Sequence, residues 1–422
     1  MAGAQRRGAP AARGAGWQEA AAVTSAPLPR ILRRRGEPEY PTFLELFFDL
    51  VYVFMFSRLA ASLADDLTIR GAAQTAVLLL AAWWVWVLTA WLTDLFNPRL
   101  PIIQATVLLV MLGTLLMAIA SPYAFGRYGW LFVAAYFGIH LARDAVLIPG
   151  TRVNRPIQAR SIRVFFWFGI TVAPWVAGLF VDDTARLVLW SIAVAVDLGS
   201  ARIGWPTPWL GRTELASQIF TGVHLSERHR AIFIVALGEL ILNTGLGLAG
   251  SGFTAGPVAA CAVAFVSAVL LFQLYFQRVQ RILAPPGVAT VERVRSGTST
   301  SYTHLVMVAG VVLVSTSTSI VVDQPFGRAP VELLAAILGG PILFLLGSVL
   351  FDAVVTARIL WSRVLAIVAL AVVALCARVV PGAFLLMPLT ALVVANLVLL
   401  LTLVCEELVA RRGAVGATAS AR

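Results

Sequence analysis

The residues most able to do chemistry are ionisable side chains inside apolar stretches of this 422-residue chain. Glu45, Asp49 and Arg58 all lie in one such stretch, residues 43–63. Glu45 and Asp49 are four residues apart, so on a helix they share a face and lie about 6 Å apart along its axis. Arg58 is too far along that helix to pair with Asp49, which predicts that each charge meets a partner on another helix. An ionisable group inside a membrane-spanning helix costs about 2.5–3.5 kcal/mol, so each one needs a structural or a functional reason.

Four further ionisable residues interrupt later apolar stretches: His140, Arg143, Asp197 and Glu239. Asp144 follows His140 by four residues, a spacing that suits a proton relay or half of a metal site. The favoured interpretation of Asp144 is instead a helix end at the membrane surface. Asp197 and Glu239 lie too deep in their stretches to reach the surface, so water or a partner must reach them.

A charged segment lies directly before one of the later apolar stretches. It contains His224, Glu227, Arg228, His229 and Arg230. Metal binding by the two histidines and the glutamate is one interpretation. The favoured interpretation is a solvated, charged helix start beside lipid headgroups.

Several enzyme classes are excluded by what the sequence lacks. All 32 basic residues are arginine, so no P-loop lysine, Schiff-base lysine or Ser-Lys dyad can form. The cysteines, Cys261, Cys376 and Cys405, stand alone in apolar sequence, and no H-E-x-x-H, G-x-S-x-G or aspartate-rich motif occurs. The sequence therefore predicts no catalytic residue, no bound metal and no cofactor.

The elements that must position these residues are apolar helices. The chain is 59% hydrophobic and only 13% charged, with a mean hydropathy of +0.87, which excludes an ordinary soluble protein. Stretches of about 18–25 apolar residues recur, each long enough to cross a bilayer. They predict an all-α, polytopic membrane protein with twelve spans at 43–63, 72–92, 102–121, 128–148, 164–181, 186–204, 231–249, 256–277, 303–322, 331–353, 362–380 and 384–404.

The arginine distribution predicts the orientation of these spans. With the N-terminus inside, 26 arginines fall on the inner side and five on the outer side, and Arg58 lies within the first span. This asymmetry is typical of the positive-inside rule, and it predicts that both termini are cytoplasmic. Contact between these inner arginines and anionic inner-leaflet headgroups also accounts for the basic composition, with a sequence pI of about 10.6. No nucleic-acid partner is therefore expected.

The domain organisation follows from these spans. Residues 1–41 are expected to form a disordered, basic cytoplasmic tail, and residues 42–204 the first six spans, which carry most of the buried charges. Residues 205–230 are expected to form a cytoplasmic loop, 231–405 the last six spans and 406–422 a second cytoplasmic tail. The second half, poor in ionisable groups, is a candidate scaffold or homo-oligomer surface. Four tryptophans of the second span are assigned to packing and to anchoring at the membrane interface: Trp83, Trp84, Trp86 and Trp91.

Several motifs resemble the bacterial low-temperature-requirement A family over about residues 37–405. They are LELFFDLVYVF at 44–54, WVW at 84–86, Arg143, DLG at 197–199, HLSER at 224–228 and LGELI at 237–241. The resemblance implies a polytopic membrane protein linked by name to growth at low temperature, in a family without an agreed biochemical activity. It singles out Glu45, Asp49, Arg143, Asp197, Glu227, Arg228 and Glu239 for testing. Arg230 and Leu240 stand where the family usually has small residues.

Three functions are compatible with these residues. The leading hypothesis is a transporter or channel for a small solute or ion, with proton coupling as one form, in the bacterial cytoplasmic membrane. Glu45, Asp49, Asp197 and Glu239 would bind a cation or protons, with Arg58 or Arg143 as counter-charges. The alternatives are an intramembrane enzyme acting on lipid or isoprenoid substrates, and a sensor or scaffold without transport.

Overall fold

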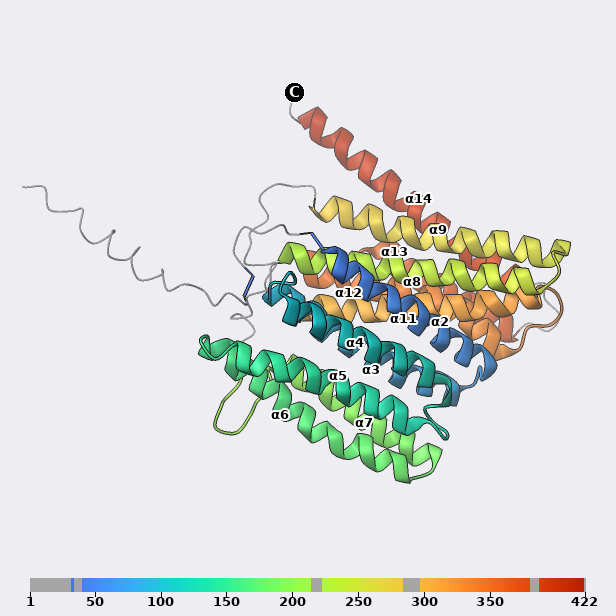
Figure 1. The fold of residues 1–422 in the computed structure, drawn as a ribbon. Coiled ribbons are helices and arrows are strands. Elements are labelled where there is room, and N and C mark those ends of the chain that lie inside the picture. Colours follow the sequence, from blue (N-terminus) through green and yellow to red (C-terminus); the bar gives the residue numbers. More distant parts are fainter. Residues whose placement is uncertain (1–31, 34–39, 214–221, 284–296, 380–386, 421–422) are drawn as a thin grey trace, which may run out of the picture.

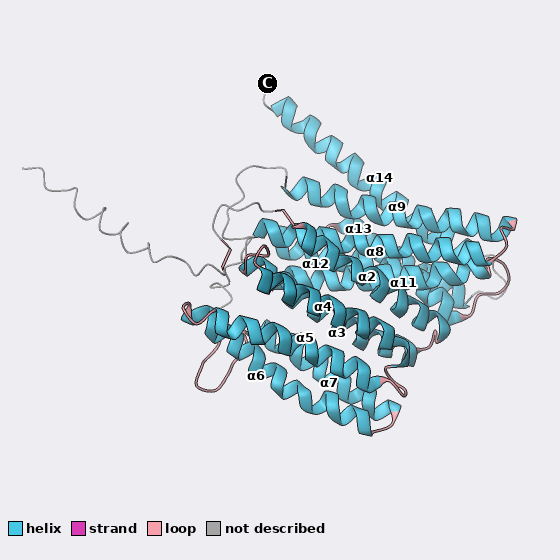
Figure 2. Cartoon of the chain, viewed as in Figure 1, coloured by secondary structure: helices cyan, strands magenta, loops and turns pink. Residues whose placement is uncertain are grey.

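The computed structural model describes residues 32–33, 40–213, 222–283, 297–379 and 387–420. The described chain is helical, without a β-strand, and holds only two isolated β-bridges (Figure 2). Residues 1–31 and 34–39, most of the tail predicted to be disordered, lie outside the described residues. The α-helices are α2 (Phe43–Asp65), α3 (Ile69–Leu95), α4 (Pro101–Ala120), α5 (Gly129–Gly150), α6 (Arg155–Ala177), α7 (Asp183–Arg202), α8 (Gly222–Gly250), α9 (Ala255–Leu283), α11 (Gly297–Asp323), α12 (Val331–Thr356), α13 (Trp361–Val379) and α14 (Pro388–Ser420).

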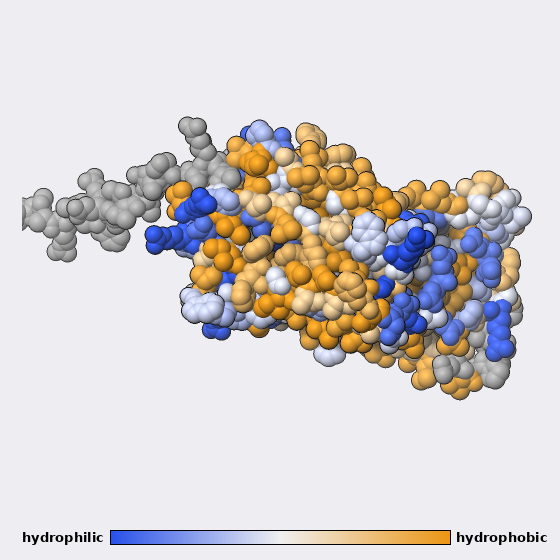
Figure 3. Space-filling view, turned by 60° about the horizontal axis from the view of Figure 1, so that its bottom comes forward, coloured by the Kyte–Doolittle hydropathy of each residue, from blue (hydrophilic) through white to orange (hydrophobic). Residues whose placement is uncertain are grey.

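The lengths of these helices match a bilayer. Eleven helices in the described part of the chain are long and apolar enough to cross a membrane, and α13 contributes a shorter apolar stretch, Trp361–Ala377. The all-helical, membrane-spanning fold is therefore confirmed, while the count of twelve spans stays a prediction. Figure 3 shows apolar side chains over the middle of one face and hydrophilic side chains gathered toward its two ends, as a membrane protein requires.

The boundaries of two helices differ from their predicted spans. Helix α8 begins at Gly222, so the charged segment is a helix start, as its favoured interpretation expects, and the predicted loop 205–230 ends earlier. Helix α14 continues to Ser420, far beyond the predicted end of its span at residue 404. In both places polar residues extend an apolar helix. Hydropathy alone marks where apolar sequence stops and leaves the end of the helix undetermined.

Helix α3 lies at the centre of the first half of the chain. It contacts α2, α4, α5, α7, α8 and α11, and nearly all of its second half is buried. A helix that is apolar on all sides is expected in such a central position. In Figure 1, α5, α6 and α7 form a group on one side of it, and the C-terminal helices lie on the other.

Helices α11 and α12 pack with their backbones in close contact. A Cβ atom on Gly310 would lie 2.5 Å from the backbone nitrogen of Phe344, and one on Gly340 would lie 2.9 Å from that of Val314. Small residues permit this approach, which is common between membrane helices because van der Waals packing stabilises them there. Helix α11 of this pair packs against α2 and α8, which carry the candidate site.

Candidate functional site

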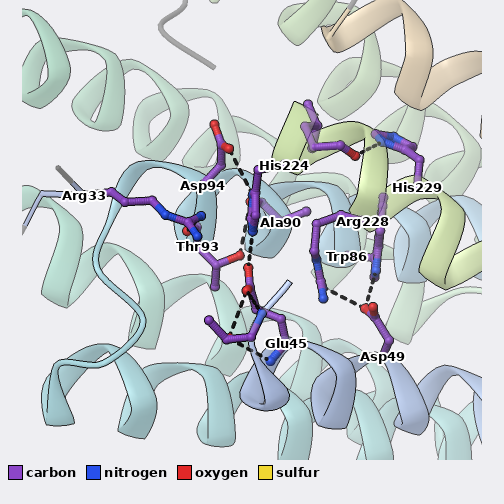
Figure 4. Close-up of polar contacts among 12 residues, drawn as sticks. Arg33, Glu45, Asp49, Trp86, Ala90, Thr93, Asp94, His224, Arg228 and His229 are labelled. Carbon is purple, nitrogen blue, oxygen red and sulfur yellow. Dashed lines mark hydrogen bonds and ion pairs between the residues drawn. The ribbon is translucent and has the colours of Figure 1, made fainter. Parts of the chain in front are cut away.

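The first polar cluster joins the beginnings of α2 and α8 to the end of α3. His224 Nδ1 lies 3.0 Å from Asp94 Oδ1, and His224 Nε2 lies 3.0 Å from Glu45 Oε1 (Figure 4). All three side chains are buried. Thr42 holds the glutamate through a capping box, because its hydroxyl oxygen accepts from the Glu45 backbone nitrogen at 3.4 Å and its own backbone nitrogen donates to Glu45 Oε2 at 2.7 Å. The hydroxyl also donates to Glu45 Oε2 at 2.9 Å. A protonated imidazole between two carboxylates would leave this cluster with a single negative charge.

The second cluster lies one helical turn further into the bundle. Arg228 Nη2 donates to Asp49 Oδ1 at 2.7 Å, and Trp86 Nε1 donates to the same oxygen at 2.8 Å (Figure 4). The guanidinium also lies over the rings of Trp86 and Phe48, 5.9 Å from each centroid. Asp49 Oδ2 and the Arg228 atoms Nε and Nη1 are buried without a hydrogen-bond partner in the described structure. The pair therefore retains unused donors and an unused acceptor that could bind water or a passing ligand.

The third cluster surrounds Glu239, deeper in the bundle between α2, α8 and α11. Glu239 Oε1 accepts hydrogen bonds from Asn243 Nδ2 and, at 2.9 Å, from Ser315 Oγ. Ser57 on α2 donates to Asn243 Oδ1 at 2.9 Å. The carboxyl group is 0% exposed, Oε2 has no partner, and no basic side chain of the described residues pairs with it. A carboxyl group in this setting is neutral, or it holds a cation, because an isolated buried charge is too costly.

The three clusters follow one face of α8. Arg228 is four residues from His224, and Glu239 is eleven residues further on, a spacing that returns to the same side of an α-helix. At 1.5 Å per residue these steps correspond to about 6 Å and about 16 Å along the helix axis. The structure thus places predicted site residues from two helices along one face of α8, at an end of the bundle and in its interior. We call this row of clusters the polar line, although buried apolar residues such as Ile232 and Ala236 lie between Arg228 and Glu239.

Two buried histidines beside this line have both of their ring nitrogens hydrogen-bonded. His229 Nδ1 lies 2.7 Å from the Leu225 carbonyl, and His304 Nδ1 lies 2.9 Å from the Thr300 carbonyl. A carbonyl only accepts, so each Nδ1 carries the hydrogen. Nε2 then accepts, from Ser301 at 3.1 Å in one ring and from Tyr275 at 2.9 Å in the other. Metal binding by the 224–229 segment is unsupported, and the described residues contain no group of three or more potential metal ligands.

A separate polar group lies in α5, α6 and α7. Asp197 accepts hydrogen bonds from Tyr136 at 2.8 Å and from Thr171 at 3.1 Å. Arg143 forms a bidentate pair with its neighbour Asp144, at 2.9 and 3.1 Å, and both are buried. The carboxylate of Asp144 therefore neutralises a buried guanidinium, while its predicted position near the membrane surface stays a prediction.

Two predicted site residues lie apart from these groups. Arg58 is half-buried and takes part in no ion pair with the described residues. Glu227 pairs with Arg230 on the other face of α8, where its side chain is 23% exposed. The same helix start buries His224 and Arg228 completely, so the interpretation of this whole segment as solvated was wrong.

Sequence reasoning missed several members of the site. The four tryptophans of α3 are buried, so their role in packing is confirmed and their role as interface anchors was wrong. One of them, Trp86, contacts Asp49 directly. Asn243 lies four residues after Glu239, a spacing that places both on one helix face and could have identified it. Ser57 and Ser315 gave no such signal, because isolated serines in membrane helices usually bond to their own backbone.

The C-terminal half contains an ionic cluster that was not expected there. Arg363 is buried and donates to Glu406 Oε1 at 2.8 Å and to the Leu274 carbonyl at 2.9 Å. It also contacts Ser348 and lies 3.9 Å from Asp352 Oδ2. The cluster therefore connects α9, α12, α13 and α14 through one guanidinium, which is a structural arrangement.

Fold and site together define a multi-pass membrane protein of apolar helices with a line of buried acids on α2, α3 and α8. The chain belongs to the bacterial low temperature requirement A protein (LtrA) family, whose model matches residues 41–398. It is 30% identical over 328 residues to an uncharacterised protein, RA0937, of Rhizobium meliloti (strain 1021), covering 77% of this chain and 80% of that protein. No solved structure matches the chain.

Proposed function

We propose that the protein transports a small cation, or a solute coupled to protons, across the bacterial cytoplasmic membrane. The observation that carries this proposal is Glu239, a fully buried carboxyl group with one unused oxygen and no basic partner among the described residues. Ionisable groups inside membrane helices typically mark ion and proton pathways. The surrounding oxygens of Ser57, Asn243 and Ser315 are the hard ligands that protons and small cations prefer.

The polar line supplies the route between Glu239 and one end of the bundle. We assign that end to the cytoplasm, because the predicted inner loops hold most of the arginines. The Asp49–Arg228 pair lies between this end and Glu239. Its unused donors and acceptor would let it exchange partners with a passing ion, so it is proposed as an inner gate.

The test is ion or proton flux into liposomes that contain the purified protein. Glu239→Gln keeps the size and hydrogen-bonding capacity of the side chain but removes its charge and its proton. The matched control is Glu227→Gln, the same substitution on the same helix at a partly exposed position. We expect Glu239→Gln to reduce flux at least about tenfold and Glu227→Gln to leave it unchanged.

Two results would count against the proposal. Equal flux in the Glu239→Gln variant and the unmodified protein would remove the acid from the pathway. Absence of flux of protons, sodium and potassium in the correctly folded, unmodified protein would refute cation transport by it.

A further inference from the structure

A small cavity lies between α3, α5, α6 and α7, away from the polar line of α8. Its volume is about 10 Å³, and its polar lining consists of His140, Asp197 and Ser200. His140 is only 1% exposed, and neither of its ring nitrogens has a hydrogen-bond partner in the described structure. A polar cavity of about this size accommodates a single water molecule, which needs two to four polar partners. The unpartnered imidazole and the carboxylate face the cavity from different helices.

Asp197 is the second polar side chain that lines this cavity. Its two oxygens accept from Tyr136 and Thr171, and no basic side chain among the described residues forms an ion pair with it. The nearest charged groups are on α5, where Arg143 is already paired with Asp144. The cavity lining from α3, by contrast, is apolar and aromatic, with Trp84 and Leu88. Asp197 thus resembles Glu239, a buried acid with neutral hydrogen-bond donors, in a different group of helices.

A second cavity lies next to this site. Its volume is about 50 Å³, and it shares two apolar residues, Leu88 and Val164, with the first cavity. It extends past Arg143 to Arg160, near the start of α6. This start lies at the same end of the bundle as the first cluster, because the cavity also contacts Leu95 and Phe96, which follow Asp94 at the end of α3.

We propose that His140 and Asp197 form a second proton-binding site, joined by an internal water molecule and reached by water from this end of the bundle. In the binding step a hydronium ion gives one proton to the Asp197 carboxylate. An O–H bond forms on Asp197, one O–H bond of the hydronium breaks, and a neutral water molecule remains, hydrogen-bonded to His140. The site is independent of Glu239, and it stands or fails separately from the proposed transport.

Radiolytic hydroxyl-radical labelling read by mass spectrometry tests the internal water, since radicals formed from a bound water oxidise the side chains around it even when these are buried. Phe168 and Trp84 line the cavity and are 5% and 4% exposed, whereas Phe125, which is 8% exposed, and Trp190, which is fully buried, do not line it. We expect at least about fivefold more labelling of the first two than of the second two in the unmodified protein. Equal labelling of all four would overturn the internal water.

Infrared spectroscopy during a pH titration tests the proton. We expect a carboxylic-acid C=O stretching band that disappears in Asp197→Asn, which keeps the size of the side chain and an oxygen for Tyr136 or Thr171. Glu239→Gln should remove a different band and leave this one in place. Identical carboxylic-acid bands in Asp197→Asn and the unmodified protein, at every pH at which both are folded, would overturn proton binding at Asp197. Loss of transport in Glu239→Gln would not affect this result.

Discussion

Substitutions that neutralise the Asp49–Arg228 pair can distinguish whether these buried charges stabilise the fold or take part in transport. Both side chains are buried, and they are joined by a 2.7 Å charge-assisted hydrogen bond between α2 and α8. Three variants are informative: Asp49→Asn, Arg228→Gln and the double variant. Each single change leaves one buried charge without its partner, whereas the double change leaves two neutral amides that can hydrogen-bond to each other.

The expected magnitudes follow from burial. Removing one partner of a buried ion pair costs about 3–5 kcal/mol, because the remaining charge is desolvated and uncompensated. Arg228 retains its position over the rings of Trp86 and Phe48 in Asp49→Asn, which should keep this loss toward about 3 kcal/mol. The double variant removes both desolvation costs, so we expect it to be within about 1–2 kcal/mol of the unmodified protein.

The measurement is reversible unfolding in mixed micelles, followed by tryptophan fluorescence, for all four proteins. A coupling free energy of about 4–7 kcal/mol between the two sites, the sum of the two single losses less the loss in the double variant, would confirm a direct pair. Additive losses would refute the argument, and so would single variants as stable as the unmodified protein. Flux through the double variant then tests the gate. A stable double variant with unchanged flux would show that the pair only holds α2 and α8 together.

Three further predictions concern other parts of the fold. Gly340→Val should separate α11 from α12 and lower the free energy of unfolding by about 1–3 kcal/mol, measured in the same micelles. The control is Gly339→Val, which should lower it less, because a Cβ atom there would make only an ordinary contact. Arg363→Met should cost about 3–5 kcal/mol through its buried carboxylate partners while leaving flux per folded molecule unchanged, and lost flux would refute its purely structural role. Backbone N–H donors of Thr184 and Ala185 lower the pKa of Asp182, which lies outside the membrane-spanning helices. Because folding lowers the pKa of Asp182, this cap stabilises the protein fully above the unfolded-state pKa of about 4. The stabilisation is lost as the pH falls through the folded-state pKa. The difference in unfolding free energy between the unmodified protein and Asp182→Asn should therefore change only below about pH 4.

The sequence predicts the helices well because one local property decides them. A bilayer requires about 20 consecutive apolar residues, so each span is visible in its own stretch of sequence. The family motifs indicate which acids to test. Asp49 and Arg228 do form a pair between α2 and α8, and Glu45 and Glu239 lie in separate clusters along the same two helices. The helix that begins at Gly222 escapes this rule, since its first turns are charged and are buried only by their neighbours.

The partners of the buried charges could not be predicted, because they are set by packing between distant segments. His224 contacts Asp94 across 130 positions of sequence, and Arg228 contacts Asp49 across 179. Helical spacing relates residues three or four apart, and it carries no information on which helices touch. The prediction that each charge meets a partner on another helix was correct for Asp49, but the proposed counter-charges, Arg58 and Arg143, were the wrong arginines for it.

The contrast among the buried acids now favours different roles for different positions. Asp49 has a guanidinium partner and Glu45 an imidazole, so both can be explained by helix packing alone. The same holds for Glu406, which neutralises Arg363. Glu239 and Asp197 have neutral hydrogen-bond donors only, an arrangement that stabilises packing poorly and suits a group that gains and loses a proton. The transport hypothesis therefore depends on Glu239, and the second proton-binding site depends on Asp197. Variants at Glu45 and Glu406 should chiefly change stability, and flux through the Asp49–Arg228 double variant decides whether that pair also acts as a gate.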